Sequence, residues 1–337
     1  MSRLMFAALA SGSGKTTVTC AFLRAMTRRG LAPAAFKAGP DYIDPMFHRQ
    51  VLGVPSYNLD LFFSDEEQIR ALLAAHSAGR SPAVLEGAMG YYDGLGGCTD
   101  TASAWHLARA TDTPVVLVLR PGSSSLTLAA QVKGLLAFRT PCQIRGLLLN
   151  GCSPMLAQTL APALIRETGL PVFGCLPKVE GADFSSRHLG LVAAEEIPEL
   201  QAKLDKLADA LEQSADLDRL LALAESAPPL PAAPLPGEAL APVPCRIAVA
   251  RDEAFCFYYD DTLELFRLLG AELCFFSPLR DTALPDGCGG LYLGGGYPEL
   301  HTQALAENHA MRQAVQANVR AGLPTLAECG GFLYLQQ

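Results

Sequence analysis

The chain has 337 residues, of which 50% are hydrophobic and 18% are charged, and its formal net charge is −8. This length and composition predict a globular protein of two domains, and the acidic balance argues against a nucleic-acid-binding surface. No run of roughly eighteen apolar residues predicts a membrane span, and the start, Met-Ser-Arg, leaves no room for a signal peptide. The ten cysteines show no zinc-binding spacing, so we expect reduced thiols in a cytoplasmic protein.

The first apolar run, residues 4–9, leads into the turn ASGSGKTT and then into a helical pattern. Strand, turn and helix in this order are typical of a phosphate-binding loop, whose backbone N–H groups and helix dipole hold phosphate oxygens. The lysine of such a loop reaches the terminal phosphates, and the next hydroxyl binds Mg²⁺. The usual opening glycine is missing, and a plain Gly/Ser turn with a surface lysine is the alternative. The predicted loop comprises Gly12, Ser13, Gly14, Lys15, Thr16 and Thr17.

Short apolar runs alternate with helical patterns along the rest of the first half. The runs lie at residues 34–36, 83–85, 115–119, 146–149 and 172–176, and helical patterns include residues 64–76 and 154–168. Such alternation predicts an α/β fold with a parallel sheet covered on both faces. Right-handed crossovers then bring the carboxyl ends of the strands to one edge, where ligands bind.

Two acidic turns follow strands at that edge. Lys37, Asp41 and Asp44 come after the run at 34–36, and two carboxylates beside a phosphate loop suit Mg²⁺. Glu86 ends the next run and precedes several glycines, which indicate close approach of the backbone to a ligand. Its carboxylate is placed to bind Mg²⁺ or to position a water molecule. In the alternative interpretation, these carboxylates only accept backbone hydrogen bonds.

The remaining strand ends carry weaker signals. Arg120 opens a turn that either starts a helix near the ligand edge or is an ordinary capped turn. Asn150 ends another strand, where it either recognises an adenine edge or serves as a turn residue. Residues 178–191, with Arg187 and His188, form a polar loop that could bind an anion.

A leucine stripe over residues 193–227 predicts a helical segment that serves in packing or as a prop between domains. Residues 227–244 follow it and contain seven prolines in eighteen residues. Such a stretch forms neither helix nor central strand, so it is interpreted as the domain linker.

A second alternating segment follows the linker. Its strands are expected at residues 247–250, 273–276, 291–293 and 325–327, and its helices at 262–269 and 305–321. Gly295 and Gly296 follow one strand in a flexible turn whose N–H groups suit an oxyanion. Cys329 follows another, on a tight strand-to-helix turn that has the pattern of a nucleophile elbow. A buried structural cysteine is the alternative.

Together the motifs FKAGPDYIDP, LEGAMGYYDG, SRHLGL, GGGYPELH and ECGGFLYL resemble those of cobyrinic acid a,c-diamide synthases. The resemblance covers essentially the whole chain. It implies a parallel-sheet, dethiobiotin-synthetase-like P-loop NTPase domain at residues 1–192, which is the ATP-binding amidoligase. It also implies a helical segment and Pro-rich linker at 193–244. An incomplete class I glutamine amidotransferase α/β domain then follows at 245–337.

The resemblance implies ATP- and Mg²⁺-dependent amidation of the a- and c-side-chain carboxylates through an acyl phosphate, with ammonia from glutamine, in cobalamin biosynthesis. Cys329 would attack glutamine, with Gly295 and Gly296 as oxyanion donors. The nucleotide would be bound by the phosphate loop with Lys37 and Asn150, and the metal by Thr16, Asp41 and Glu86. The corrinoid acid would lie near Asp41, Tyr42, Ile43, Asp44 and Asp93.

In this family the histidine and carboxylate that complete the triad follow the elbow, whereas this chain ends eight residues after Cys329. We therefore expect a truncated chain that uses ammonium salts but not glutamine. His301 is a poor substitute for the triad base, because it belongs to the GGGYPELH turn.

Three rival interpretations remain. Cobyric acid synthases share both domain types but resemble this chain less around EGAMGYYDG. A switch ATPase of the partitioning kind would have neither the elbow domain nor its cysteine, and a nucleotide-binding remnant would lack catalysis.

The expected partners are the corrinoid acid, ATP, and glutamine or ammonia, without nucleic acid or membrane, and a homodimer is a further possibility. The sequence does not distinguish between three substrates: cobyrinic acid, hydrogenobyrinic acid and nickel sirohydrochlorin.

Overall fold

The computed structural model describes residues 1–182, 197–231, 234–235 and 240–336. The chain divides into two compact units, Met1–Leu235 and Pro236–Gln337. None of the helices in these ranges combines the length and the apolar character that a membrane span needs. Of the polar loop expected at residues 178–191, the part from 183 onward, with Arg187 and His188, lies outside the described residues.

The first unit is built on a seven-stranded sheet in the order β3-β2-β4-β1-β5-β6-β7. Every neighbouring pair of strands in it is parallel, which confirms the predicted fold class. The strands are β1 (Arg3–Ala8), β2 (Ala34–Ala38), β3 (Ser56–Leu59), β4 (Ala83–Glu86), β5 (Val115–Leu119), β6 (Ile144–Asn150) and β7 (Val172–Leu176).

Strand β3 is the one strand of this sheet that the sequence pattern does not predict. Its four residues, Ser-Tyr-Asn-Leu, include two polar side chains and so give no apolar run. The strand forms at the sheet edge because its polar groups find partners. Asn58 is 8% exposed and donates from Nδ2 to the carbonyl oxygens of Gly39 and Asp41 at 2.9 and 2.7 Å.

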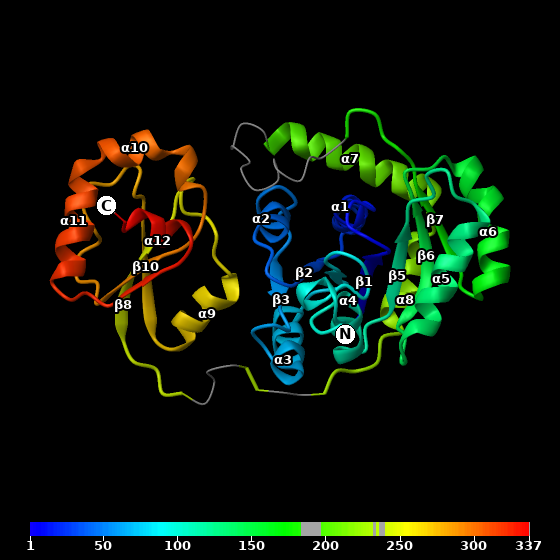
Figure 1. Ribbon diagram of the computed structural model, residues 1–337, viewed down its shortest axis with the longest axis horizontal. Helices are drawn as coiled ribbons and strands as arrows, with labels where there is room; N and C mark the ends of the chain where they lie inside the picture. The colour runs from blue at the N-terminus through cyan, green and yellow to red at the C-terminus, as the bar shows by residue number, and fades with distance from the viewer. Residues whose placement is uncertain (183–196, 232–233, 236–239, 337) are drawn as a thin grey trace. The chain divides into compact units, whose positions relative to one another are not determined.

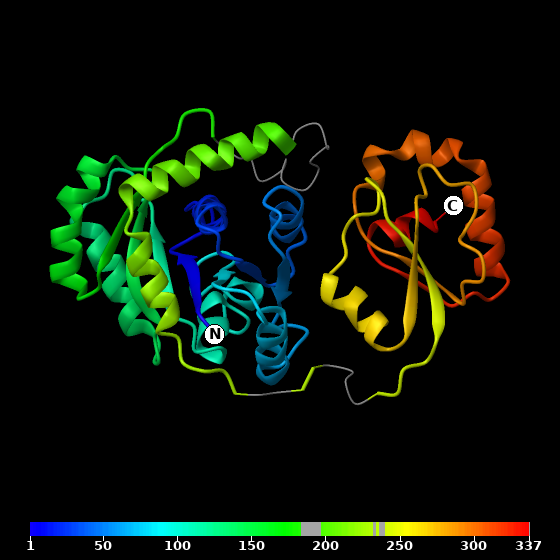
Figure 2. The same ribbon diagram turned by 180° about the vertical axis from the view of Figure 1, so that it is seen from behind.

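Helices cover both faces of the sheet (Figure 1, with the view from behind in Figure 2). Side chains alternate across a strand, so Phe6 of β1 enters one apolar cluster and Met5 enters the other. The first cluster joins the sheet to α1 (Lys15–Arg28), α2 (Ile43–Gln50), α7 (Ile197–Ser214) and α8 (Leu217–Glu225). The second joins it to α3 (Glu66–His76), α4 (Ala104–Ala110), α5 (Leu126–Phe138) and α6 (Pro154–Thr168).

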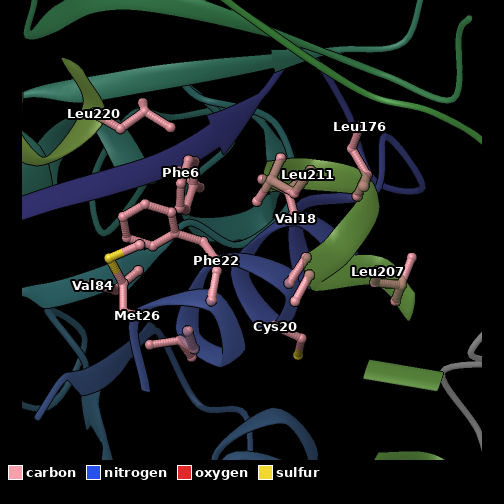
Figure 3. Packing of buried hydrophobic residues seen from close by; sticks show 14 of the residues in the cluster. Phe6, Val18, Cys20, Phe22, Met26, Val84, Leu176, Leu207, Leu211 and Leu220 are labelled. Carbon is pink, nitrogen blue, oxygen red and sulfur yellow. The ribbon is translucent and has the colours of Figure 1, made fainter. Parts of the chain in front are cut away.

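The leucine-rich segment belongs to the first unit. Figure 3 shows Leu207 and Leu211 of α7 and Leu220 of α8 in the same apolar cluster as Phe22 of α1. The segment is two helices, because Asp216 accepts a hydrogen bond from the Arg219 N–H and caps the second one. Its leucines therefore serve in packing.

The second unit holds a parallel four-stranded sheet in the order β11-β10-β8-β9. Its strands are β8 (Cys245–Ala250), β9 (Ala271–Phe276), β10 (Gly290–Leu293) and β11 (Thr325–Ala327). Its helices are α9 (Asp260–Leu268), α10 (Thr302–Glu307), α11 (His309–Arg320) and α12 (Gly330–Tyr334). The single helix expected at residues 305–321 is wrong, because Asn308 leaves helical geometry and caps α11 through the Met311 N–H.

Candidate active site

The predicted phosphate loop joins β1 to α1, as its sequence indicates. Gly12 and Gly14 have φ values of +74° and +88°, a region that favours glycine. A Cβ atom on Gly14 would fall 2.0 Å from Nδ2 of Asn150, so no other residue fits there without a shift. Asn150 donates from Nδ2 to the Ser13 carbonyl oxygen at 2.9 Å. In this structure its amide therefore supports the loop, and the adenine-binding role expected for it remains a prediction.

Lys15 links the phosphate loop to the loop that follows β4. Its ammonium donates to the carbonyl oxygen of Met89 at 2.5 Å and to that of Ala10 at 3.3 Å. The residue is 7% exposed, and burial lowers its pKa below the ordinary lysine value. Met89 has a φ of +46°, an uncommon conformation for a non-glycine residue. The lysine is thus positioned at the sheet edge where phosphates are expected.

Thr16 and the two acidic turns meet in one buried cluster, which we call the carboxylate cluster: Thr16, Lys37, Asp44 and Glu86. Thr16 Oγ1 donates to Glu86 Oε1 at 2.6 Å and lies 3.4 Å from Asp44 Oδ2. Lys37 Nζ donates to the same two oxygens, at 2.8 Å to Glu86 and 2.5 Å to Asp44. Lys37, Asp44 and Glu86 are only 5%, 6% and 1% exposed.

The lysine determines the charge state of this cluster. Burial disfavours the charged form of Lys37, but the attraction of the Glu86 and Asp44 carboxylates is larger than this cost. The pKa of the ammonium is therefore raised. Burial likewise opposes a charged Asp44, but Lys37 outweighs it and holds the pKa of that carboxyl below its usual value. For Glu86 burial dominates and raises the pKa. The cluster is an ion pair with a second carboxyl group shared by the same lysine.

The carboxylate cluster fits a hard cation. Glu86 Oε2 is buried and has no hydrogen-bond partner among the described residues. A free carboxylate oxygen beside a threonine hydroxyl and a second carboxylate is the kind of donor set that Mg²⁺ takes together with phosphate oxygens. These residues could therefore hold the metal that the phosphate loop implies.

Asp41 and Asp44 have different environments. Asp41 Oδ1 accepts hydrogen bonds from the N–H groups of Ile43 and Asp44 at 2.8 and 3.1 Å, so it caps the start of α2. Its other oxygen lies 3.7 Å from Lys37, and its side chain is 33% exposed. Asp44, expected near the corrinoid acid, lies closer to Thr16 than the sequence interpretation assumed.

The other predicted substrate residues lie around these turns. Tyr42 directly precedes α2, and Ile43 begins it and packs partly against the apolar core. Asp93 accepts a hydrogen bond from the Gly90 N–H at 2.9 Å, which closes the turn after β4. All three therefore lie at the same edge of the sheet as the carboxylate cluster.

A pocket of about 680 Å³ runs along this edge and collects most of the predicted groups. It is lined by the phosphate loop, the carboxylate cluster and Asp41, and also by residues that follow β7, such as Pro177 and Val179. Arg120 borders it and donates to the Gly12 carbonyl oxygen at 3.3 Å. Val179 belongs to the loop expected at residues 178–191, whereas the sequence analysis did not single out Pro177.

In the second unit, Cys329 occupies the turn between β11 and α12. It is exposed and has a φ of +47°, the strained geometry expected of an elbow. The start of α12 is bonded to the turn after β10 and to the residue before Cys329. The Gly331 N–H donates to the carbonyl oxygens of Gly294 and Glu328, both at 2.9 Å. A Cβ on Gly331 would meet the Leu293 carbonyl oxygen at 2.1 Å, so a larger residue would force the turn apart.

The glycine turn after β10 lies beside this cysteine. A Cβ on Gly295 would be 3.5 Å from Cys329 Cβ, and the Gly295 carbonyl oxygen accepts a bond from the Phe257 N–H at 3.0 Å. Gly296 has a φ of +155°, and a Cβ there would fall 2.1 Å from the Ala254 carbonyl oxygen. The structure thus brings together the cysteine and the two glycines that the sequence singled out.

Comparison with known proteins covers both units. Residues 4–192 match the family model of the CobQ/CobB/MinD/ParA nucleotide binding domain, and residues 246–337 match that of the CobB/CobQ-like glutamine amidotransferase domain. The chain is 41% identical over 337 residues to the cobyrinate a,c-diamide synthase of Listeria innocua and 41% identical over 338 residues to that of a Synechococcus species. Each alignment covers 99% of this chain and 74% of the relative. The corresponding Gloeobacter violaceus protein is 43% identical over 333 residues, or 98% of this chain and 73% of that protein.

Proposed function

We propose a mechanism on the premise that this chain belongs to the cobyrinate a,c-diamide synthase family. It is an ATP-dependent amide ligase of cobalamin biosynthesis that takes its nitrogen from glutamine. The family and the reaction class expected from the sequence are thereby confirmed, and the expectation that this chain uses ammonium salts but not glutamine stays a prediction. Substrate range, metal and the roles of individual residues are proposals, and they are supported by the geometry of the two sites.

The reaction must first activate a carboxylate, which is a poor electrophile at neutral pH. A carboxylate oxygen of the corrinoid acid attacks the γ-phosphorus of ATP, the bond to the β-phosphate oxygen breaks, and an acyl phosphate and ADP form. Ammonia then attacks the acyl carbon, the C–O bond to phosphate breaks, and the amide nitrogen loses a proton. Charge on the transferred phosphoryl group is the main feature that the protein has to stabilise.

The carboxylate cluster, next to Lys15, is the observation that carries this mechanism. When phosphates bind, Lys15 exchanges its bonds to the Met89 and Ala10 carbonyl oxygens for bonds to phosphate oxygens. Thr16, Asp44 and Glu86 would hold Mg²⁺, which would neutralise phosphate charge. Lys37 keeps the two carboxylates paired and correctly placed. We assign Asp44 to the metal rather than Asp41, because only Asp44 lies within 3.4 Å of Thr16 Oγ1.

The remaining groups take the substrate and the glutamine. Asp41, Tyr42, Ile43 and Asp93 border the place where the corrinoid carboxylate would approach. In the second unit, the thiolate of Cys329 attacks the glutamine carboxamide carbon, the amide nitrogen takes a proton from solvent and leaves as ammonia, and a thioester forms. Water then cleaves the C–S bond of the thioester, which releases glutamate and the cysteine sulfur. The N–H groups of Gly295 and Gly296 would stabilise the oxyanion of that step. A homodimer and a cytoplasmic location stay predictions.

One assay tests the proposal. The full chain is incubated with ATP, Mg²⁺ and either glutamine or ammonium chloride, together with cobyrinic acid, hydrogenobyrinic acid or nickel sirohydrochlorin. We expect ADP and amide to form in equal amounts with cobyrinic acid and not without a tetrapyrrole acid. ATP turnover that no tetrapyrrole stimulates would contradict an amide ligase and would favour a nucleotide-dependent switch.

A further inference from the structure

Two adjacent aromatic side chains are exposed beyond the end of β3. Phe62 and Phe63 are 60% and 70% exposed, and their rings meet edge to face with centroids 4.9 Å apart. Exposing apolar surface costs about 25 cal/mol per Å², so two neighbouring exposed rings indicate a ligand or partner surface.

Hydrogen bonds close the turn that carries these rings. Asp60 is 8% exposed, and its Oδ1 accepts a hydrogen bond from the Phe62 N–H at 2.9 Å. Its carbonyl oxygen accepts one from the Ser64 N–H at 3.0 Å. Asp65 and Gln68 then form a reciprocal capping box at the start of α3. Burial of Asp60 disfavours its charged form and raises its pKa. The carboxyl group nevertheless closes this turn through its hydrogen bond with the Phe62 N–H.

The rings lie at the same sheet edge as the proposed active site. Strands β3, β2 and β4 are parallel neighbours. Adjacent strands of a sheet are about 4.8 Å apart, so the turns that follow these strands lie side by side. Asn58 bonds the end of β3 to the Asp41 turn through the carbonyl oxygens of Gly39 and Asp41. Beyond that turn, after β4, comes Met89, whose side chain is 45% exposed. Apolar side chains thus flank the Asp41 turn on both sides.

The geometry points to a substrate platform. We propose that Phe62 and Phe63 contact the apolar face of the corrinoid macrocycle and orient it so that a rim carboxylate reaches the γ-phosphate bound at Lys15. This rests on the proposed function, and it assigns specificity-determining residues to that reaction. A macrocycle with apolar faces and carboxylates on its rim matches two rings beside a polar edge. Two rings offer far less area than the roughly 800 Å² per partner of a stable protein interface, which favours the small molecule over a protein.

Binding measurements on single variants test the platform. Phe62→Ala and Phe63→Ala are each compared with wild type and with Ile165→Ala, which removes another exposed apolar side chain, 45% exposed, from α6. Aromatic contacts of this kind correspond to about a 2- to 13-fold change in affinity. We expect the Kd for cobyrinic acid to rise by that factor in each phenylalanine variant, with unchanged Tm and Kd for ATP. Phe63→Tyr, which keeps the ring, should stay close to wild type.

The outcomes separate the two proposals. If wild type binds and amidates cobyrinic acid but Phe62→Ala and Phe63→Ala bind it equally well, the platform is wrong and the proposed function stands. The platform is also wrong if only the oligomeric state changes, since the rings would then be a protein contact. If wild type neither binds nor amidates the acid, the proposed function fails and the platform fails with it. An equal loss in Ile165→Ala would also overturn the platform, because the effect would not depend on location.

Discussion

Replacing Lys37 with methionine tests the carboxylate cluster most directly. The variant keeps much of the apolar stem but removes the ammonium that donates to Asp44 and Glu86 at 2.5 and 2.8 Å. Both carboxylates are almost fully buried, so they would lose their shared counter-charge. Breaking a buried ion pair from one side costs about 3–5 kcal/mol. In a unit of this size each kcal/mol lowers Tm by roughly 2–4 °C, so we expect a fall of about 6–20 °C near neutral pH.

The loss of stability should be smaller in acid. In wild type the folded-state pKa of Lys37 is raised, so its contribution is fully present below the unfolded lysine pKa of about 10.4 and is lost only as pH rises through the folded value. In Lys37→Met, burial without the ammonium raises the folded-state pKa of Asp44 and Glu86. The variant therefore becomes less stable as pH rises above the unfolded carboxyl values of about 3.9 and 4.3. The difference from wild type should be largest near neutral pH and shrink towards about pH 5.

Thermal unfolding of the full chain, followed by circular dichroism at both pH values, measures this effect. Lys203→Met is the matched control. It removes a lysine whose ion pair with Glu199, at 2.8 Å, is open to solvent, with the two side chains 27% and 73% exposed, and such a pair contributes no more than about 1 kcal/mol. Adding Asp44→Asn to Lys37→Met should restore part of the Tm, since one unpaired charge disappears. A fall of less than about 3 °C near neutral pH, or an equal fall at both pH values, would refute the reasoning.

Three further predictions concern activity. Lys15→Ala should abolish ATP turnover while the circular dichroism spectrum stays that of wild type, since the lysine supplies charge to the phosphates; normal ATP affinity and turnover would remove the phosphate-loop assignment. Asp44→Asn and Glu86→Gln should each raise the Mg²⁺ concentration for half-maximal turnover by about tenfold, and Asp41→Asn should raise it less; a larger effect of Asp41→Asn in a Mg²⁺ titration would return the metal to Asp41. Cys329→Ser, in any form of the protein that uses glutamine, should lose glutamine-dependent amidation and keep activity with ammonium salts; retained glutamine use would assign the nucleophile to another residue.

The sequence by itself determined the features that depend on local order. Strand, glycine turn and helix follow one another from Arg3 to Arg28 as the phosphate-loop pattern predicts. The parallel sheets follow from alternating apolar runs, because long crossovers between strands leave few other topologies. Cys329 was found in the same way, since a cysteine between a short strand and two glycines is typical of a nucleophile elbow.

Only the tertiary structure decided which side chains meet. Asp41 and Asp44 are indistinguishable as sequence signals, yet α2 begins at Ile43, so Asp41 caps the helix while Asp44 reaches Thr16. Strand β3 escaped prediction because its polar residues are paired by groups distant in sequence, such as the Gly39 carbonyl oxygen that binds Asn58. The exposure of Phe62 and Phe63 was equally hidden, because burial is a property of the assembled sheet edge. Local patterns report backbone order, whereas contacts and burial depend on where the chain returns in space.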